Sequence, residues 1–233
     1  MAKRDYDNDY PSVTQVLGVL RKIGLEMWFK YNSAKECDAL SKAGREAGTD
    51  THDAIQQYIE TGKAKIESKY ADEVSTALQS FILFRKENPE IELSLSEVAL
   101  THPNYQYNGT IDAPHPPILC DWKTGNAKDK DAPDIYDEAK AQVAAYVSLW
   151  NINNIDKWIK KAYIVSLAKD KVAYKIYSME EEEIDGWFNE VFLPALKIFN
   201  FQKQQKQIEK ERKKDARNGH EPREKAEDQK IDA

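Results

Sequence analysis

Three charged residues that lie close together in the sequence have side chains suited to metal-assisted chemistry. Asp112 ends the segment Gly109–Asp112, and Asp121 and Lys123 follow shortly after it. Side chains alternate along a strand, so Asp121 and Lys123 should share a face that Asp112 can approach from a neighbouring strand. Two carboxylates can bind a hard divalent cation, and a nearby lysine can orient a water or stabilise charge on a phosphate. This combination is typical of phosphodiester hydrolysis.

The same residues also have a purely structural interpretation. Acids at strand ends are common, and Lys123 could neutralise the two aspartates as an ion pair. Against this, apolar residues precede both acids (Ile111 and residues 118–120), and a charge at the end of a buried strand needs a partner or a metal. Clusters of perturbed charges are found in both settings, so these residues alone leave both interpretations open.

Two further patterns lie on expected helices. His52, in the segment Gly48–His52, should share a helix face with Ile55, and Gln142 and Tyr146 are four residues apart on one face of a later helix. Each pattern has a simpler explanation. His52 could be a hydrogen-bonded histidine near a helix start, and the other pair could be helix surface with a packed tyrosine.

Together these patterns resemble a known family. The ordered set Gly-Thr-x-x-His, Gly-x-Ile-Asp, Asp-x-Lys-Thr-Gly and Gln-x-x-x-Tyr is similar to the RecB-like branch of the PD-(D/E)XK nucleases, over residues 11–177. The segment Tyr10–Thr14 also resembles the start of small exonucleases of this branch, including phage proteins and the mitochondrial genome maintenance exonuclease.

The resemblance implies roles for five residues. Asp112 and Asp121 would bind Mg²⁺ or Mn²⁺, the Trp122 backbone carbonyl would be an additional ligand, and His52 would complete the metal shell. Lys123 would orient the attacking water and stabilise the transition state.

Other implied roles are less direct. Gln142 and Tyr146 would contact the DNA backbone or Lys123. Glu97 is a secondary metal candidate, with a solvated strand acid as the alternative. Relatives with an iron–sulfur cluster use four cysteines, and the two cysteines of this chain cannot supply one; no phosphate-binding loop is present either.

The implied function is a Mg²⁺- or Mn²⁺-dependent DNA exonuclease that acts on DNA ends in recombination, repair or replication. The alternatives are a structure-specific endonuclease, a non-cleaving nucleic-acid-binding or assembly protein on the same fold, and a metal-independent scaffold. Expected partners are DNA and a recombination or replication protein. Candidate DNA-contacting residues are Lys22, Lys30, Lys35, Lys42, Arg45, Lys128 and Lys130, with Trp28, Phe29 and Tyr31 as candidates for base stacking.

The bulk composition sets broad limits. The chain has 233 residues, 41% of them hydrophobic, and a net charge of −6, which argues weakly against a surface coated in positive charge. We find no apolar signal segment and no run of about 18 apolar residues, so we expect neither export nor a membrane span. The two cysteines are far apart and form no CxxC pattern, which fits a reducing cytoplasm. The resemblance to phage-type exonucleases implies a bacterial cell, with the cell or a phage as the coding source.

These side chains need a scaffold of helices and strands. Apolar periodicity predicts an α/β (α+β) fold with a mixed central sheet flanked by helices and a helical N-terminal region. The resemblance implies a restriction-endonuclease-like core within a single nuclease domain, residues 1–202. Its parts are a helical region (1–90), a sheet core (91–180) and the start of a long helix (181–202), with a charged tail, helical or disordered, over 203–233.

The predicted elements follow from residue periodicity and turn signals. We expect helices at 11–31, 33–47, 49–60, 69–88 and 135–149, strands at 92–101, 105–112, 118–123, 160–168 and 172–178, a turn at 113–117, a long helix from about 180, and disorder beyond about 215.

Overall fold

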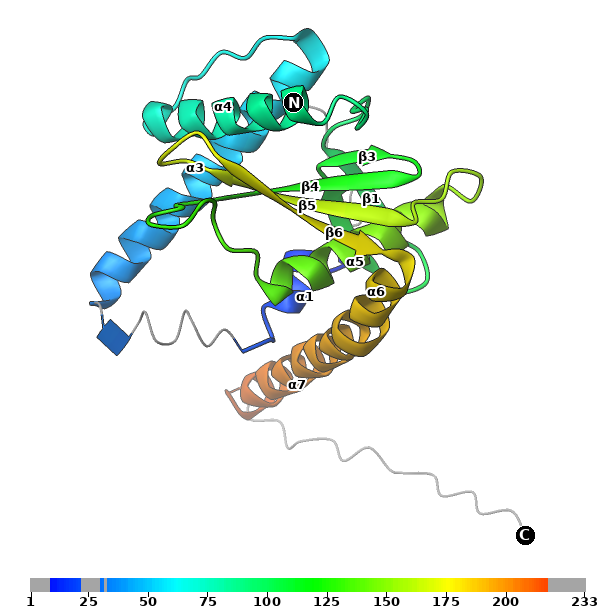
Figure 1. The fold of residues 1–233 in the computed structure, drawn as a ribbon. Helices are drawn as coiled ribbons and strands as arrows, with labels where there is room; N and C mark the ends of the chain where they lie inside the picture. The colour runs from blue at the N-terminus through cyan, green and yellow to red at the C-terminus, as the bar shows by residue number, and fades with distance from the viewer. Residues whose placement is uncertain (1–8, 22–29, 32, 218–233) are drawn as a thin grey trace.

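The computed structural model describes residues 9–21, 30–31 and 33–217 (Figure 1). The elements in chain order are α1 (Val13–Leu17), α3 (Ala34–Thr61), α4 (Ala71–Glu87), β1 (Val98–His102), β2 (Tyr107–Ile111), β3 (Ala113–His115), β4 (Ile118–Gly125), α5 (Asp137–Asn153), β5 (Lys161–Ala168), β6 (Tyr174–Glu180), α6 (Glu181–Trp187), the π-helix η1 (Phe188–Phe192) and α7 (Leu193–Arg217).

The central sheet is mixed. Its strand order is β3-β4-β5-β6; β4 and β5 run parallel, and the two outer pairs are antiparallel. Strands β1 and β2 form a separate antiparallel pair. The predicted mixed sheet flanked by helices is therefore confirmed. None of the described helices combines the length and the apolar character that a membrane span requires.

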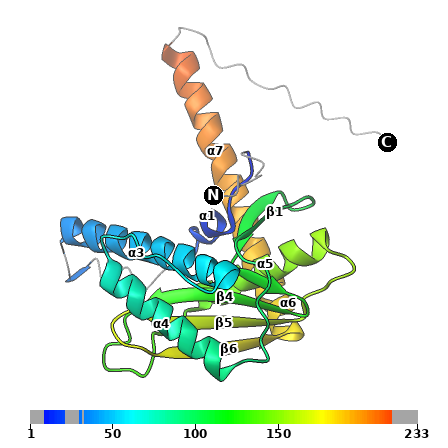
Figure 2. The same ribbon diagram turned by 90° about the horizontal axis from the view of Figure 1, so that it is seen from above.

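Helices cover both faces of the sheet. Helices α3 and α4 lie over one face, and α5 and α6 lie over the other (Figures 1 and 2). Trp122 of β4 points to the first face, where its ring packs 5.1 Å from Phe81 and 5.8 Å from Phe84. Leu119 of the same strand belongs to the opposite core, with α5. Because side chains alternate along β4, Asp121 and Lys123 belong to the α5 face.

One long helix replaces two predicted ones. We expected helices at 33–47 and 49–60, separated near Gly48, but α3 is continuous through both and the prediction of a break was wrong. An interior glycine costs a helix only about 1 kcal/mol. A Cβ at Gly48 would lie 3.5 Å from Thr124 Oγ1, so α3 crosses β4 at this point. The helix ends at Thr61, close to the predicted end at residue 60, and its C-cap Gly62 has a left-handed φ of 73°.

The first helix is much shorter than predicted. Instead of spanning 11–31, α1 covers five residues, capped by the Ser12 hydroxyl, and gives way to turns at Gly18. Glycine has low helix propensity, and the three buried residues of α1 already supply its packing face. Residues 22–29 of the predicted helix lie outside the described part of the chain.

One strand prediction and one turn prediction also need correction. Within the predicted strand 92–101, only β1 pairs with another strand; it begins directly after Glu97, which has a φ of 52° and whose N–H donates a hydrogen bond to the Asp112 carbonyl at 2.9 Å. Most of the predicted turn at 113–117 is strand β3, which pairs with the start of β4. Pro114 has no backbone N–H to donate, and β3 accommodates it because this strand lies at the edge of the sheet.

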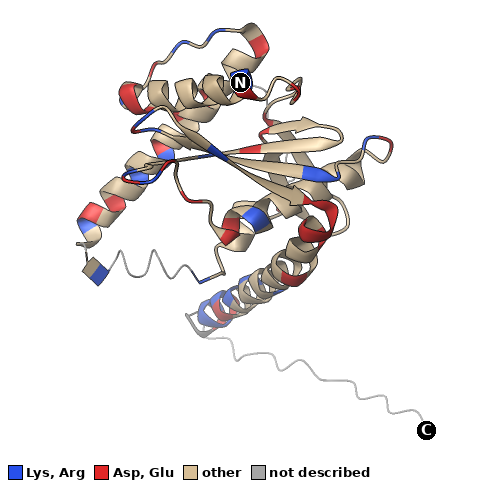
Figure 3. Cartoon of the chain, viewed as in Figure 1, with Lys and Arg blue, Asp and Glu red and all other residues tan. Residues whose placement is uncertain are grey.

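The remaining elements lie close to their predicted positions. The C-terminal helical region continues without a loop through α6, η1 and α7 to Arg217, so the first part of the predicted charged tail is helical. Basic and acidic residues are mixed along α7 (Figure 3). The predicted disorder falls mainly on 218–233, which lie outside the described residues.

Candidate metal and catalytic site

Three side chains from separate elements converge beside β4. His52 comes from the second half of α3, Glu97 immediately precedes β1, and Asp112 lies between β2 and β3. The His52 Nδ1 atom lies 3.3 Å from Glu97 Oε1 and 3.4 Å from Asp112 Oδ1, and one potential ligand atom from each residue lies within 4.8 Å of the others. An imidazole and two carboxylates are donors that divalent cations accept, so this donor set fits a metal site.

Electrostatic interactions shift the pKa values of His52 and Asp112. Burial would lower the pKa of His52, but the charges of Asp112 and Glu97 and their hydrogen bonds raise it to about 10. Burial would likewise raise the pKa of Asp112, yet His52, Lys123 and the Trp122 N–H hold it below its usual range. Without a metal, His52 is therefore an imidazolium whose Nδ1 proton lies between two carboxylates.

The backbone fixes the position of Asp112. Its Oδ2 atom accepts a hydrogen bond of 2.7 Å from the Trp122 N–H, and the side chain is buried. Hydrogen bonds to a carboxylate from a backbone N–H are among the stronger ones in proteins. This bond ties the end of β2 to the middle of β4, which brings the two sequence motifs together.

Asp121 faces Lys123. The Lys123 Nζ atom forms an ion pair with Asp121 Oδ2, and the Asp121 side chain is 1% exposed. Burial raises the pKa of Asp121 to about 6, and the charge of Asp112 adds to this, outweighing the opposing effect of Lys123. The pKa of Lys123 is raised despite its burial, chiefly by Asp121 and Asp112 and also by Glu138, so its amine is an ammonium.

The structure therefore groups the predicted site residues somewhat differently from the sequence. His52 and Asp112 lie together as expected, but Glu97 is their neighbour and Asp121 is turned to Lys123. Glu97 is not the solvated strand acid considered as its alternative, since its side chain is 23% exposed and contacts His52. Its metal role and that of the Trp122 carbonyl remain predictions.

Gln142 and Tyr146 interact with each other. The Gln142 Nε2 atom donates a 2.9 Å hydrogen bond to the Tyr146 hydroxyl, and it lies 3.5 Å from Thr14 Oγ1. A Cβ at Gly109 would be 2.8 Å from Tyr146 Cε1, so the glycine of the second motif lets Tyr146 approach β2 closely. Their contact with DNA or with Lys123 remains a prediction.

The candidate DNA-contacting residues fall into two groups. Those on and just before α3 are exposed: Lys30, Tyr31, Lys35, Lys42 and Arg45. Lys128 and Lys130 belong to the loop after β4 and are exposed as well. The predicted contacts at Lys22, Trp28 and Phe29 lie outside the described residues.

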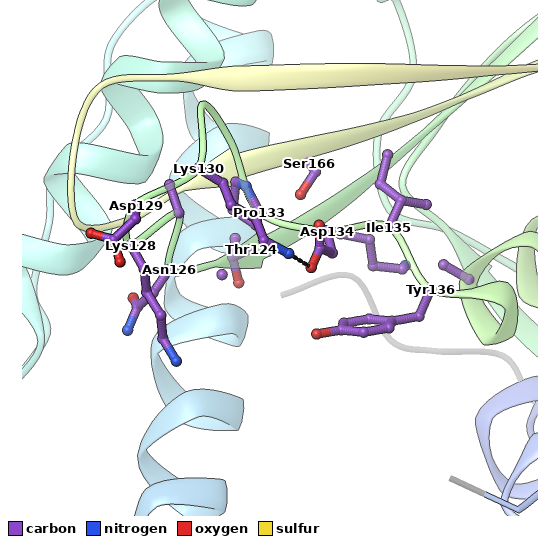
Figure 4. A pocket seen from close by; sticks show the side chains of 14 residues that line it. Thr124, Asn126, Lys128, Asp129, Lys130, Pro133, Asp134, Ile135, Tyr136 and Ser166 are labelled. Atoms are coloured by element: carbon purple, nitrogen blue, oxygen red, sulfur yellow. Dashed lines mark hydrogen bonds and ion pairs between the residues drawn. The ribbon is translucent and has the colours of Figure 1, made fainter. Parts of the chain in front are cut away.

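A pocket that no sequence motif indicates opens next to Lys123. It has a volume of about 560 Å³ and lies between the end of β4, the loop that leads into α5, and β5 (Figure 4). Ser166 of β5 contributes to its wall, directly opposite Lys123 in the strand register. An isolated serine within an apolar strand pattern is uninformative, so only the pairing of β4 with β5 reveals its position.

Comparisons with known proteins give distant likenesses. No family model matches the chain, and no curated protein matches it. Similar solved structures include LHK-Exo in complex with dAMP (TM-score 0.41, 17% identity, 72% of this chain and 92% of that one). Others are a phage-related exonuclease from Haemophilus somnus 129PT (0.40, 13%, 83% and 93%) and a putative exonuclease from Eubacterium rectale (0.36, 16%, 68% and 83%). These likenesses are too distant to carry an argument about this chain.

Proposed function

We propose that this chain is a metal-dependent DNA exonuclease with a PD-(D/E)XK-type site. One observation supports the proposal most: the His52–Glu97–Asp112 group lies beside the ion pair that Lys123 forms with the buried Asp121. A cation-binding donor set next to a lysine ammonium is an arrangement that can carry out metal-assisted phosphodiester hydrolysis. The order of the motifs in the sequence supports the same superfamily.

The residues of the chain have separate roles in this proposal. His52, Asp112 and Glu97 would hold the cation, and Asp121 and the Trp122 carbonyl would be further ligands. Mg²⁺ and Mn²⁺ both suit oxygen donors. When bound, the cation lowers the pKa of a water and neutralises phosphate oxygens.

Lys123 supplies the second positive charge. Its ammonium is kept beside β4 by Asp121, where it can donate a hydrogen bond to the attacking water or to a phosphate oxygen. The Lys123 side chain is 30% exposed while that of its partner is buried, so part of the lysine remains accessible from solvent.

The test uses end-labelled linear DNA and closed circular DNA, both single- and double-stranded, with Mg²⁺, Mn²⁺ or EDTA. Loss of linear DNA in metal but not in EDTA supports the exonuclease, and cleavage of closed circles would favour the structure-specific endonuclease. Lys123→Ala should abolish cleavage, whereas Lys86→Ala, an exposed lysine on α4, should retain it. Metal-independent binding without any cleavage, unchanged in Asp121→Ala, would refute the enzyme and favour the non-cleaving alternative.

The cellular role follows from the same proposal. An exonuclease of this kind would process DNA ends during recombination, repair or replication, together with a protein of one of those processes. Co-purification of such a partner with the catalytically inactive Lys123→Ala protein, in a form that DNase treatment does not disrupt, is the corresponding measurement; loss of the partner on DNase treatment would count against a direct contact.

A further inference from the structure

The pocket beside Lys123 lies at a favourable place in the fold. It occupies the space beyond the carboxyl ends of the parallel strands β4 and β5 and before the first turn of α5. Ligands of α/β proteins bind preferentially at the carboxyl ends of parallel strands. Its volume of about 560 Å³ is within the range of sites that bind small organic molecules, roughly 300–1,000 Å³.

A buried hydroxyl in the wall of this pocket lacks a partner. Ser166 is 1% exposed, and its Oγ atom makes no hydrogen bond with any described residue. Buried side-chain polar atoms are nearly always hydrogen-bonded, so an exception that borders a pocket calls for an explanation. A polar ligand in the pocket would supply the missing partner.

The loop after β4 adds a lysine whose backbone is anchored. Asp170 accepts hydrogen bonds from the N–H groups of Ala127 (2.9 Å) and Lys128 (3.0 Å), which anchors the loop to the β5–β6 turn. Lys130 is neutralised by an ion pair with Asp134. Lys128 lines the pocket and forms no ion pair with any residue in the described part of the chain, so its charge remains available for an anion.

An aromatic ring completes the pocket on the other side. Tyr136 is 72% exposed although it precedes a helix that is largely buried, and it lies across the pocket from Asn126 and Lys128 (Figure 4). An exposed ring of this kind can stack on a nucleobase, an interaction that tolerates any base. Hydroxyl, cation and ring match the sugar, phosphate and base of a nucleotide.

We propose that this pocket binds the nucleotide adjacent to the phosphate under attack. Ser166 hydrogen-bonds the nucleotide from the wall of the pocket, Lys128 faces its flanking phosphate, and Tyr136 stacks on its base. Lys123 borders both the pocket and the metal-binding group, so a nucleotide here has its phosphodiester next to the ammonium. The inference rests on the proposed nuclease function, and it makes Ser166 and Tyr136 positioning residues.

The test measures binding separately from cleavage. Calorimetry with deoxynucleoside 5′- and 3′-monophosphates, with unmodified deoxynucleosides and inorganic phosphate as further arms, gives the affinity of the pocket for each part of the ligand. Ser166→Ala should weaken monophosphate binding about 3- to 10-fold, the effect of one hydrogen bond. Tyr136→Ala should weaken it at least about 5-fold, and Tyr136→Phe should not.

Control variants separate this effect from general damage. Ser166→Thr keeps the hydroxyl and should restore binding, and Ser178→Ala, an exposed serine on the neighbouring strand, should have no effect. The Mn²⁺ affinity of Ser166→Ala should equal that of the wild type, and its unfolding midpoint should be equal or higher, because an unpaired buried hydroxyl is removed.

The outcomes distinguish the two proposals. If no monophosphate binds, or if Ser166→Ala and Tyr136→Ala both bind it as well as the wild type does, the pocket assignment is overturned, even if the protein degrades DNA. If binding depends on Ser166 but no DNA is cleaved under any metal condition, the pocket assignment stands and the nuclease function fails. Binding of inorganic phosphate alone, insensitive to Tyr136, would also overturn the nucleotide assignment.

Discussion

Replacing Asp121 by asparagine should stabilise the metal-free protein while abolishing its activity. The folded-state pKa of about 6 exceeds the ordinary value of 3.8, so the charged carboxylate is disfavoured in the fold. The resulting loss of folding free energy is absent below about pH 4 and fully present above about pH 6. At about 1.36 kcal/mol per unit of pKa, it amounts to roughly 3 kcal/mol.

The asparagine variant does not recover all of this free energy. Lys123 loses its carboxylate partner, and its side chain is mostly buried at 30% exposure. We therefore expect a net gain of about 1–2 kcal/mol in the free energy of unfolding at about pH 8. For a domain of this size that corresponds to a rise in Tm of roughly 3–6 °C.

Urea denaturation in EDTA between about pH 4.5 and pH 8.5 measures the gain. The difference between Asp121→Asn and wild type should grow as pH rises to about 6 and then stay constant. Asp170→Asn is a matched control of opposite sign, because N–H groups of Ala127 and Lys128 lower the pKa of Asp170. Saturating Mn²⁺ should stabilise the wild type more than the variant. A variant less stable than wild type at pH 8, or a difference independent of pH, would refute the reasoning.

Three further predictions address other parts of the structure. Because His52 has a pKa of about 10 and must be neutral to bind a metal, Mn²⁺ binding at about pH 7.5 should release about one proton, measured by calorimetry in buffers of different ionisation enthalpy. Absence of proton release would contradict the combination of a raised His52 pKa and a ligand role for this residue. Gly109→Ala places a Cβ 2.8 Å from Leu149 Cδ2 and should lower the free energy of unfolding by about 1–3 kcal/mol, seen as a lower urea midpoint; an unchanged midpoint would contradict this close approach. Gly62→Ala, at φ 73°, should lower the free energy of unfolding by about 1 kcal/mol, whereas Gly44→Ala, in open space within α3, should raise it by about 0.5–1 kcal/mol. Equal Tm values for the two variants would contradict the helical position of Gly44 and the left-handed position of Gly62.

The sequence predicted the parts of the fold that follow from local periodicity. Strand β4 and helix α5 both lie near their predicted positions. The strand was indicated by a short apolar run, and the helix by apolar residues that recur over several turns. The continuity of α3 was not predictable, since local propensity alone favoured a stop at Gly48 and the packing of the helix across β4 overrides it. The left-handed conformation of Glu97 was likewise not predictable, because glutamate rarely adopts a positive φ.

The sequence indicated which residues belong to the candidate site better than it indicated which of them contact one another. Motif spacing identified His52, Asp112 and Lys123, but the partner of each charge depends on distances between elements that are far apart in sequence. Asp121 alternates with Trp122 as expected, yet only the tertiary structure shows that it contacts Lys123 and that Glu97 contacts His52. Ser166 was missed because two tertiary features single it out: its position opposite Lys123 in the sheet and the lack of a hydrogen-bond partner for its Oγ atom among the described residues.

Because α3 is continuous, its exposed first turns and His52 belong to one rigid helix. The helix crosses β4 at Gly48, one turn before His52, while its first turns extend away from the sheet (Figure 2). At 1.5 Å per residue, the arm from Gly48 back to Ala34 is about 21 Å and the arm forward to His52 is about 6 Å. A rigid rod pivoting at the crossing would move His52 by roughly 0.3 Å for each 1 Å of displacement at Ala34. A displacement of the exposed end of this helix would thus reach the His52 imidazole as a movement in the opposite direction, reduced to about one third.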